Sequence, residues 1–362
     1  MKLFNNIFEN KKVLITGDTG FKGSWLAIWL KELGAEVFSY ALPPQREEDN
    51  FVKCNLNNII CHQDGDIRDR VKLNDYFVKV QPEIAFHLAA QPLVLESYKN
   101  PHYTFETNIM GTVNFFEAIR NTKSIKAAVN ITSDKCYQNN EWIWGYREND
   151  PMGGKDPYSA SKGCSELVTN AYLSSFFTNH THCSIATARA GNVIGGGDWA
   201  ENRIVPDFFR ALKKGQSLVI RNPKATRPWQ HVLEPLSGYL SLAAKLYKDG
   251  NKYSGGWNFG PLDQANHSVS TLVNEIIRYL GNGQAIFEEK IEKLHEANLL
   301  KLDISKAVQK LNWKPVLDFK ETVEFTVNGY VDEDKSDTYD KRKNQIESYI
   351  ELANQRKIGW SL

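Results

Sequence analysis

Short apolar runs alternate with helical patterns over the first half of the chain. The runs that resemble strands are rich in β-branched residues, as is typical of a parallel sheet covered on both faces: Lys12–Thr16, Glu36–Tyr40, Ile59–Gln63, Ile84–Leu88, Ala127–Thr132 and Cys183–Ala188. Three segments between them have helical spacing: Ser24–Leu33, Asn108–Arg120 and Ser159–Phe177. This alternation predicts an α/β fold with a Rossmann-like doubly wound parallel sheet.

The pattern changes after residue 190. Glycine, proline and tryptophan become dense from Gly191 to Trp229, and the remainder mixes short strands with amphipathic helices. This change predicts a smaller α/β domain that binds the substrate. We expect residues 1–188 and about 229–262 to form the nucleotide-binding domain, and about 189–228 and 263–362 to form the smaller one.

Composition then narrows the class of protein. With 362 residues, 41% of them hydrophobic and 24% charged, the chain is globular rather than disordered, and of about two domains. Its 44 basic and 43 acidic side chains give no reason to expect nucleic acid or a membrane as partner. The five scattered cysteines and the polar start MKLFNNIFENKK indicate a cytoplasmic protein, and the cysteine and histidine spacings predict no metal site.

A glycine-rich segment follows the first predicted strand and opens the first helix. Gly17–Gly23 (GDTGFKG) has the glycines that let backbone N–H groups approach the pyrophosphate of a dinucleotide, although an ordinary strand–helix turn is the alternative. The second strand lacks the usual ribose-binding acid and Arg46 lies nearby, so NAD and NADP both remain open. Asp66 and Ile67, after the third strand, are either adenine contacts or a turn.

Polar groups also occur where a parallel sheet binds its ligands. Ser133-Asp134-Lys135 directly follows a predicted strand, and open α/β sheets bind at the carboxyl ends of their strands. Tyr158 and Lys162 lie four residues apart on one helical face, where an ammonium helps a phenol to act as a base. The alternatives are a polar loop and a solvated surface pair. Arg203 and Arg227 suit a phosphate ligand, or are surface residues.

Seven stretches carry a family resemblance: residues 17–26 (GDTGFKGSWL), 87–94 (HLAAQPLV), 107–118 (TNIMGTVNFFEA), 132–137 (TSDKCY), 156–167 (DPYSASKGCSEL), 189–207 (RAGNVIGGGDWAENRIVPD) and 225–240 (ATRPWQHVLEPLSGYL). In this order they resemble the extended short-chain dehydrogenase/reductase family, and within it the CDP-glucose 4,6-dehydratases. Related sugar-nucleotide dehydratases commonly have glutamate where this chain has Lys135, whereas the CDP-glucose group has lysine. Leu95 stands where arginine is expected, so one substrate contact is expected to differ.

The resemblance implies a role for each matching residue. It implies catalytic roles for Ser133, Asp134, Lys135, Tyr158 and Lys162. It implies NAD contacts for Gly17, Thr19, Gly20, Phe21, Gly23, Asp66, Ile67, Leu88, Ala89, Ala90, Asn108, Tyr158 and Lys162. It implies that Asn192, Arg203 and Arg227 bind the substrate diphosphate.

The resemblance also implies a reaction. CDP-glucose would become CDP-4-keto-6-deoxyglucose and water through an internal hydride cycle of NAD: oxidation at C4, elimination across C5 and C6, and reduction at C6. Such a lyase serves deoxysugar synthesis for cell-surface polysaccharide and forms a homodimer through sheet-flanking helices. A sugar-nucleotide 4-epimerase or reductase on the same scaffold, and a non-catalytic dinucleotide-binding sensor, are the alternatives.

Overall fold

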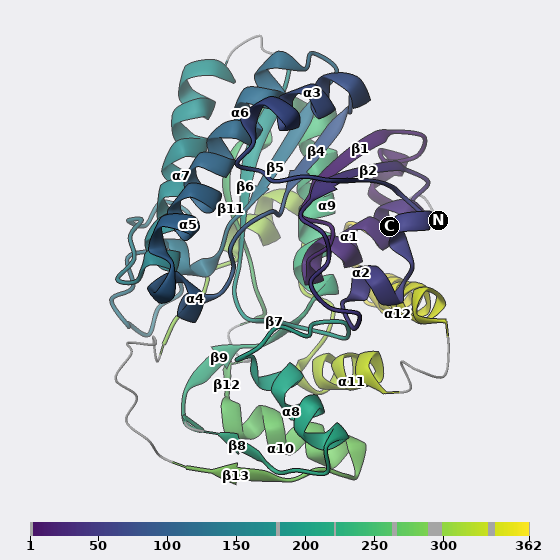
Figure 1. Cartoon of the computed structure of the whole chain (residues 1–362), viewed down its shortest axis with the longest axis vertical. Coiled ribbons are helices and arrows are strands. Elements are labelled where there is room, and N and C mark those ends of the chain that lie inside the picture. The colour runs from purple at the N-terminus through teal and green to yellow at the C-terminus, as the bar shows by residue number, and fades with distance from the viewer. Residues whose placement is uncertain are drawn as a thin grey trace.

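A seven-stranded parallel sheet forms the centre of the larger lobe (Figure 1). The computed structural model describes residues 3–178, 182–220, 222–262, 266–288, 299–331 and 337–361. The strand order is β11-β6-β5-β4-β1-β2-β3. The strands are β1 (Lys12–Thr16), β2 (Glu36–Ala41), β3 (Cys61–Asp64), β4 (Ile84–His87), β5 (Ala127–Ile131), β6 (Ser184–Ala190) and β11 (Gly255–Phe259). The predicted doubly wound parallel sheet is therefore confirmed.

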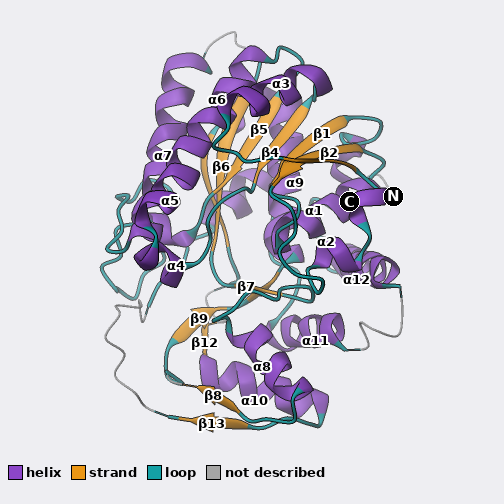
Figure 2. Ribbon diagram, viewed as in Figure 1, coloured by secondary structure: helices purple, strands orange, loops and turns teal. Residues whose placement is uncertain are grey.

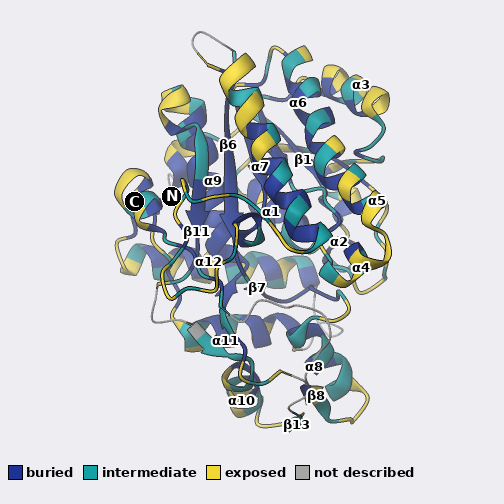
Figure 3. Ribbon diagram, turned by 90° about the vertical axis from the view of Figure 1, so that its left-hand side faces the viewer, coloured by how far each residue is buried: buried dark blue, intermediate teal, exposed yellow. Residues whose placement is uncertain are grey.

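Helices cover both faces of this sheet (Figure 2). One face packs against α1 (Phe21–Glu32) and α9 (Leu233–Asp249), and the other against α3 (Arg70–Val80), α6 (Gly111–Asn121) and α7 (Pro157–Phe176). A further helix, α12 (Thr338–Gln355), packs on α1. Every residue of β5 and β6 is buried, as expected for strands covered on both faces (Figure 3). Shorter helices are α2 (Asn50–Lys53), α4 (Val94–Lys99) and α5 (Pro101–Phe105). Among the described residues, no helix is both long and apolar enough to cross a membrane.

A smaller lobe lies beyond the carboxyl ends of the strands (Figure 1). Its helices are α8 (Ile204–Lys213), α10 (Val269–Leu280) and α11 (Phe319–Tyr330). Its two-stranded pairings are β7 (Val193–Ile194) with β10 (Gln230–His231), β9 (Thr226–Pro228) with β12 (Asn266–Ser268), and β8 (Leu218–Ile220) with β13 (Ala285–Phe287). Trp229, Phe208 and Leu272 belong to a separate hydrophobic cluster, so this lobe has its own core.

The C-terminal part of the chain returns to the larger lobe. Tyr349 of α12 packs edge-on against Trp29 of α1, with ring centroids 5.8 Å apart. Trp313 lies in the same hydrophobic cluster. Residues of α12 also bond to α11 of the smaller lobe, because Arg342 donates to the carbonyl of Gly329 and Gln345 to that of Phe325. Part of the segment 263–362, which the sequence pattern assigned to the smaller lobe, therefore also packs on the larger one. The reason is that the outer face of α1 is apolar and needs a cover.

Strand register brings four loops to one edge of the sheet. Thr16 at the end of β1 pairs with His87 at the end of β4, and His87 pairs with Asn130 of β5. Ile131 pairs in turn with Ala188 of β6. The segments that follow these strands therefore meet at the carboxyl edge, which faces the smaller lobe.

Candidate active site

The glycine segment forms a tight turn between β1 and α1. Gly17 has φ +83°, and a Cβ there would lie 2.6 Å from the backbone nitrogen of Ala89. A Cβ on Gly23 would lie 2.1 Å from the carbonyl oxygen of Gly17, so both positions require glycine. Gly20 is exposed and is the N-cap of α1, with no side chain capping the helix. The first turn of α1 is therefore positioned to receive an anion.

Other predicted cofactor residues surround this turn. Thr19 donates its hydroxyl to the carbonyl of Leu42 after β2, at 2.9 Å, and Phe21 is half-buried at the start of α1. The half-exposed loop Leu88–Ala90 follows β4. These residues share the carboxyl edge with the glycine turn, so they are placed together as the predicted site requires.

Asp66, Ile67 and Asn108 have partners inside the protein. Asp66 accepts hydrogen bonds from Arg68; burial acts to raise the pKa of Asp66, but these bonds keep it below its usual value. Ile67 is buried, and its carbonyl accepts from Asn114 at 3.0 Å. Asn108 lies in a π-helical turn (Glu106–Met110), where its amide bonds to the backbone of Gln91 and to Ser161. Asn108 therefore holds the loop after β4 against α7.

The polar strand end that the resemblance predicts to be catalytic follows β5. Ser133 donates to Oδ1 of Asp134 at 2.9 Å, and the backbone N–H of Lys135 donates to the Ser133 hydroxyl at 3.2 Å. Asp134 is 5% exposed, and burial raises its pKa despite the charge of Lys135 and the Ser133 bond. A carboxyl group that retains its proton is able to act as a general acid.

Tyr158 and Lys162 lie in the first turns of α7 and are both buried. Burial raises the pKa of the Tyr158 phenol to about 12, although its hydrogen bond with the Ser133 side chain acts to lower it. Burial lowers the pKa of Lys162 to about 8. The Lys162 ammonium donates to the carbonyl of Ile131, next to the strand end, at 3.4 Å. The structure thus brings together a phenol, an amine, a hydroxyl and a carboxyl group whose pKa is raised by burial.

Sequence comparison decides which enzymes share this arrangement. A family model described as GDP-mannose 4,6 dehydratase matches residues 14–326. CDP-glucose 4,6-dehydratase of Salmonella typhimurium LT2 is 50% identical over 322 residues, which cover 88% of this chain and 90% of that one. The chain belongs to the sugar-nucleotide 4,6-dehydratases. The resemblance inferred from the motifs is confirmed.

Solved structures agree with the fold of this dehydratase. DesIV, a dTDP-glucose 4,6-dehydratase from Streptomyces venezuelae solved with NAD bound, is 22% identical, with a TM-score of 0.73 over 88% of this chain and 96% of that one. The epimerase Mth375 from Methanothermobacter thermautotrophicus is 23% identical, with a TM-score of 0.77 over 95% of this chain and 96% of that one. Dehydratases and epimerases therefore share this scaffold, and only the site distinguishes them.

The three predicted substrate residues of the dehydratase occupy different parts of the edge. Asn192 lies between β6 and β7, and Arg227 lies on β9. Arg203 binds Oδ2 of Asp198 at 2.9 Å, and its charge acts to lower the pKa of Tyr158. A Cβ on Gly191 would lie 2.8 Å from Oδ2 of Asp134, so the segment that carries Asn192 touches the catalytic carboxyl group.

A small pocket adjoins this segment. Gly191, Pro228, Gln230 and Lys301 line it. Gly191 and Pro228 are adjacent in sequence to Asn192 and Arg227, so the pocket lies next to two of the predicted diphosphate residues.

Lys22 lies close to the predicted site residues, but the glycine motif does not single it out. It lies within the glycine segment, and the charges of Asp134, Lys162 and Arg203 all act on it. Burial and the Arg203 charge lower the pKa of Lys22 to about 8. Because the glycines define the motif, the pattern itself gives no sign that this lysine faces the catalytic groups.

A second unpredicted group lies under the glycine segment. Oδ2 of Asp18, which is fully buried, accepts from Ser39 of β2 at 2.7 Å and lies 2.8 Å from Nδ1 of His62 on β3. Nε2 of His62 lies 3.1 Å from Asp64. Burial acts to lower the pKa of His62, but Asp18 and then Asp64 raise it above 6.5 overall. These contacts tie the glycine turn to the next two strands.

We expect His62 to make the stability of this dehydratase depend on pH. Folding favours protonated His62, so its contribution is complete below about pH 6.5 and is lost as pH rises through its raised pKa. Denaturant unfolding of the wild type and His62→Gln should differ most in free energy on the acidic side, and the difference should shrink at alkaline pH. A difference that stays constant with pH would contradict this.

Proposed function

We propose that the protein is an NAD-dependent CDP-glucose 4,6-dehydratase, which converts CDP-glucose to CDP-4-keto-6-deoxyglucose and water. The observation that carries the proposal is the 50% identity to the Salmonella enzyme over 88% of this chain. The matched region includes Ser133-Asp134-Lys135, which lies beside Tyr158 in the structure. A 4-epimerase of the same fold would need no acid and base for elimination.

The glycine turn fits a dinucleotide. Protein backbone fills the space beside Gly17 and Gly23, whereas a Cβ on Gly20 would meet only the Gly17 carbonyl, at 3.4 Å. The exposed side of Gly20 therefore leaves room for a pyrophosphate at the start of α1. Gly17, Thr19, Gly20, Phe21 and the Leu88–Ala90 loop would hold the cofactor. When bound, NAD supplies the acceptor of hydride from C4 and its donor to C6.

Tyr158 acts first, as the base that takes the proton of the sugar 4-hydroxyl group. Burial disfavours its phenolate, and the positive charge of Arg203 acts in the opposite direction by lowering the pKa of Tyr158. We expect the charge of Lys162, on the same helical face, to favour the phenolate as well. The shared hydrogen bond with Ser133 places the phenol beside the strand end. The resulting 4-ketone makes the C5 hydrogen acidic.

Lys135 and Asp134 then carry out the elimination. Lys135 takes the C5 proton, and Asp134 in its protonated form gives its proton to the leaving 6-hydroxyl group, which departs as water. Reduction at C6 would then be completed by return of the proton from Lys135 to C5. After these steps the phenol has gained a proton and Asp134 has lost one. Ser133 contacts both groups, so its hydroxyl is placed to pass the proton from Tyr158 to Asp134.

The proposal extends to the substrate, the oligomer and the location. Asn192, Arg203 and Arg227 would bind the diphosphate. A homodimer through the sheet-flanking helices α6 and α7 is supported by two large apolar residues at the surface. They are Met110, which directly precedes α6 and is 49% exposed, and Leu167 of α7, which is 59% exposed. A reducing cytoplasm suits the five cysteines, all of which are free thiols.

CDP-glucose deuterated at C4 tests the reaction directly. We expect the purified enzyme to place the deuterium in the C6 methyl group of the product, as measured by mass spectrometry and NMR. Tyr158→Phe serves as the control, which should form little product. Product without deuterium at C6 would contradict the internal cycle, and deuterium kept at C4 of an inverted sugar would identify an epimerase.

A further inference from the structure

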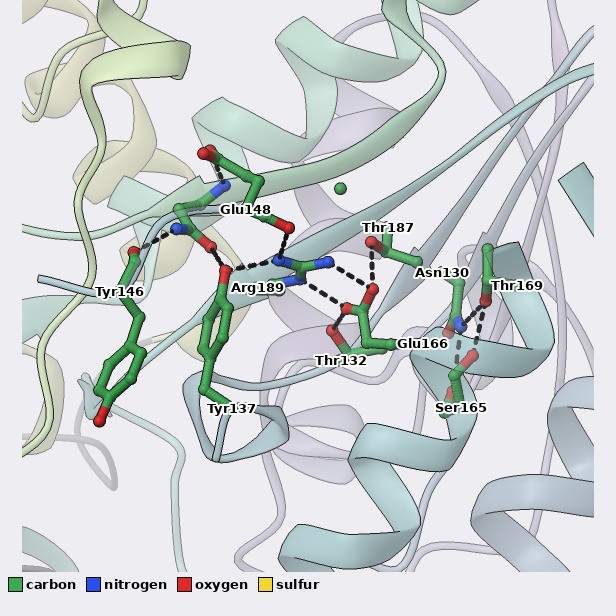
Figure 4. A network of polar contacts seen from close by, with 12 residues as sticks. Asn130, Thr132, Tyr137, Tyr146, Glu148, Ser165, Glu166, Thr169, Thr187 and Arg189 are labelled. Atoms are coloured by element: carbon green, nitrogen blue, oxygen red, sulfur yellow. Dashed lines mark hydrogen bonds and ion pairs between the residues drawn. The ribbon is translucent and has the colours of Figure 1, made fainter. Parts of the chain in front are cut away.

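A buried ion pair behind the catalytic residues has no role in the reaction as described so far. Figure 4 shows this pair, which is formed by Glu166 of α7 and Arg189 of β6. Glu166 is 5% exposed and Arg189 is 4% exposed. The guanidinium group binds the carboxylate through two bonds, Nε to Oε1 at 2.9 Å and Nη2 to Oε2 at 2.8 Å. Such a paired geometry fixes both side chains in orientation as well as in distance.

Both members of the pair bind further groups. Glu166 accepts the hydroxyl of Thr132 and, at 2.8 Å, that of Thr187. Nη1 of Arg189 donates to the Tyr137 hydroxyl and to the carbonyl of Glu148. The Tyr137 hydroxyl donates in turn to Asn258 of β11 at 2.8 Å. Every carboxylate oxygen and every guanidinium nitrogen therefore has a partner.

Two of these partners, and both members of the pair, are close in sequence to proposed active-site residues. Thr132 precedes Ser133, and Tyr137 comes two residues after Lys135. Glu166 lies four residues after Lys162 on the same helix, and Arg189 lies three residues before Asn192. One ion pair thus joins the strand end that carries the acid and base, the helix that carries the phenol and ammonium, and the strand that leads to the substrate.

Stabilisation of the fold is a weak explanation for the presence of this buried ion pair. Removing two charges from water costs several kcal/mol per ion, and apolar residues of equal volume often stabilise a protein as well or better. Fixed geometry is a stronger reason, because a displacement of about 1 Å at reacting groups can cost about 100-fold in rate.

We propose that Glu166 is a positioning residue for dehydration: paired with Arg189, it fixes the strand end and the catalytic helix relative to each other, and its negative charge faces Lys162. The proposal rests on the function proposed above. It adds a residue whose effect is exerted through Lys162 and Ser133, since Glu166 itself touches neither substrate nor cofactor.

The electrostatics of Lys162 agree with this geometry. Burial lowers the pKa of Lys162 to about 8, and Glu166 is the foremost group that opposes the shift. The other titratable groups that act on Lys162 or feel its charge are Cys136, which acts to raise its pKa, Lys22 and His87. His87 is neutral near pH 7, because burial lowers its pKa to about 3. Glu166 is thus the main negative charge available to Lys162.

Glu166→Gln tests the proposal through the pH profile of turnover with CDP-glucose and NAD. Loss of the charge should lower the pKa of Lys162, so the alkaline limb of kcat against pH should move to lower pH. We also expect kcat to fall by about 10- to 100-fold through misplacement, with KM changed by less than about threefold. Glu166→Gln alone leaves Arg189 buried without its anionic partner. The double variant Glu166→Gln/Arg189→Met has no such isolated charge, and we expect its alkaline limb of kcat against pH to move to lower pH as well.

Glu234→Gln is the matched control. Glu234 is another buried carboxylate, 1% exposed, which accepts from the backbone of Val316 and Leu317 and from Tyr349. It lies on α9, so its loss should lower the melting temperature without moving the alkaline limb. If both Glu166 variants also lower only the melting temperature and leave the limb unmoved, the positioning role is wrong. Wild-type enzyme that fails to dehydrate CDP-glucose would instead contradict the proposed function.

Discussion

Lys135→Ala should oxidise CDP-glucose at C4 and then stop before elimination. Tyr158 and Lys162 remain in place, so the first step needs nothing from Lys135, whereas removal of the C5 proton loses its base. We expect kcat for the keto-deoxy product to fall by about 100- to 10,000-fold, the usual contribution of a general base. Stopped-flow absorbance should show reduced nicotinamide accumulating on mixing, with almost no product in the same sample.

The exposed Lys155 provides a matched control, because it is a lysine of the same connecting region without a place at the strand end. Lys155→Ala should keep both the rate of product formation and the low level of reduced nicotinamide. Full turnover by Lys135→Ala would remove Lys135 from the mechanism and leave the C5 proton to another group.

Among alanine substitutions of the three glycines in the glycine segment, we expect Gly23→Ala to disrupt the turn most. Its Cβ would lie 2.1 Å from the Gly17 carbonyl oxygen and 2.8 Å from the Cα of Asp18. Both are backbone atoms, so relief requires α1 to move away from β1. Overpacking of this kind costs about 1–3 kcal/mol. We expect a lower melting temperature and a large loss of NAD affinity by isothermal titration calorimetry.

Gly20→Ala separates these two effects. A Cβ there meets only one atom, at 3.4 Å, and the residue has ordinary negative φ, so stability should change little. The same methyl group would stand in the space we assign to the pyrophosphate, so NAD affinity should still fall. A Gly20→Ala protein with unchanged NAD affinity would show that the pyrophosphate lies elsewhere.

The sequence predicted most of the strands and helices of the larger lobe, and it indicated which of the main site residues are neighbours. Parallel strands of alternating α/β units place their carboxyl ends at one edge, so residues after β1 and β5 had to be neighbours. Helix α1 begins at Phe21 rather than Ser24, which puts Gly23 inside the first turn. Gly23 therefore serves the packing of helix on strand, while Gly20 faces the anion site.

The groups that the sequence did not predict are pairs of charged residues that lie far apart in the chain. Glu166 lies on a helix that also bears polar surface residues, so only its partners on β5 and β6 reveal that it is buried. Asp18 and His62 are separated by 44 positions, and neither has a motif that marks it. Local patterns carry no information about such charge pairs, because their energy depends on burial and on distance in the fold.

The cover of α1 has a consequence for synthesis of the protein. Glu32 at the end of α1 accepts a hydrogen bond from Tyr339 of α12, 307 positions later. Ribosomes add about 5–20 residues per second, so α1 waits roughly 15–60 s for this partner. Until then Trp29, which is fully buried in the finished fold, has part of its cover missing. The nucleotide-binding lobe therefore completes its core late in translation, and a nascent chain that stalls before α12 would present an apolar helix to chaperones.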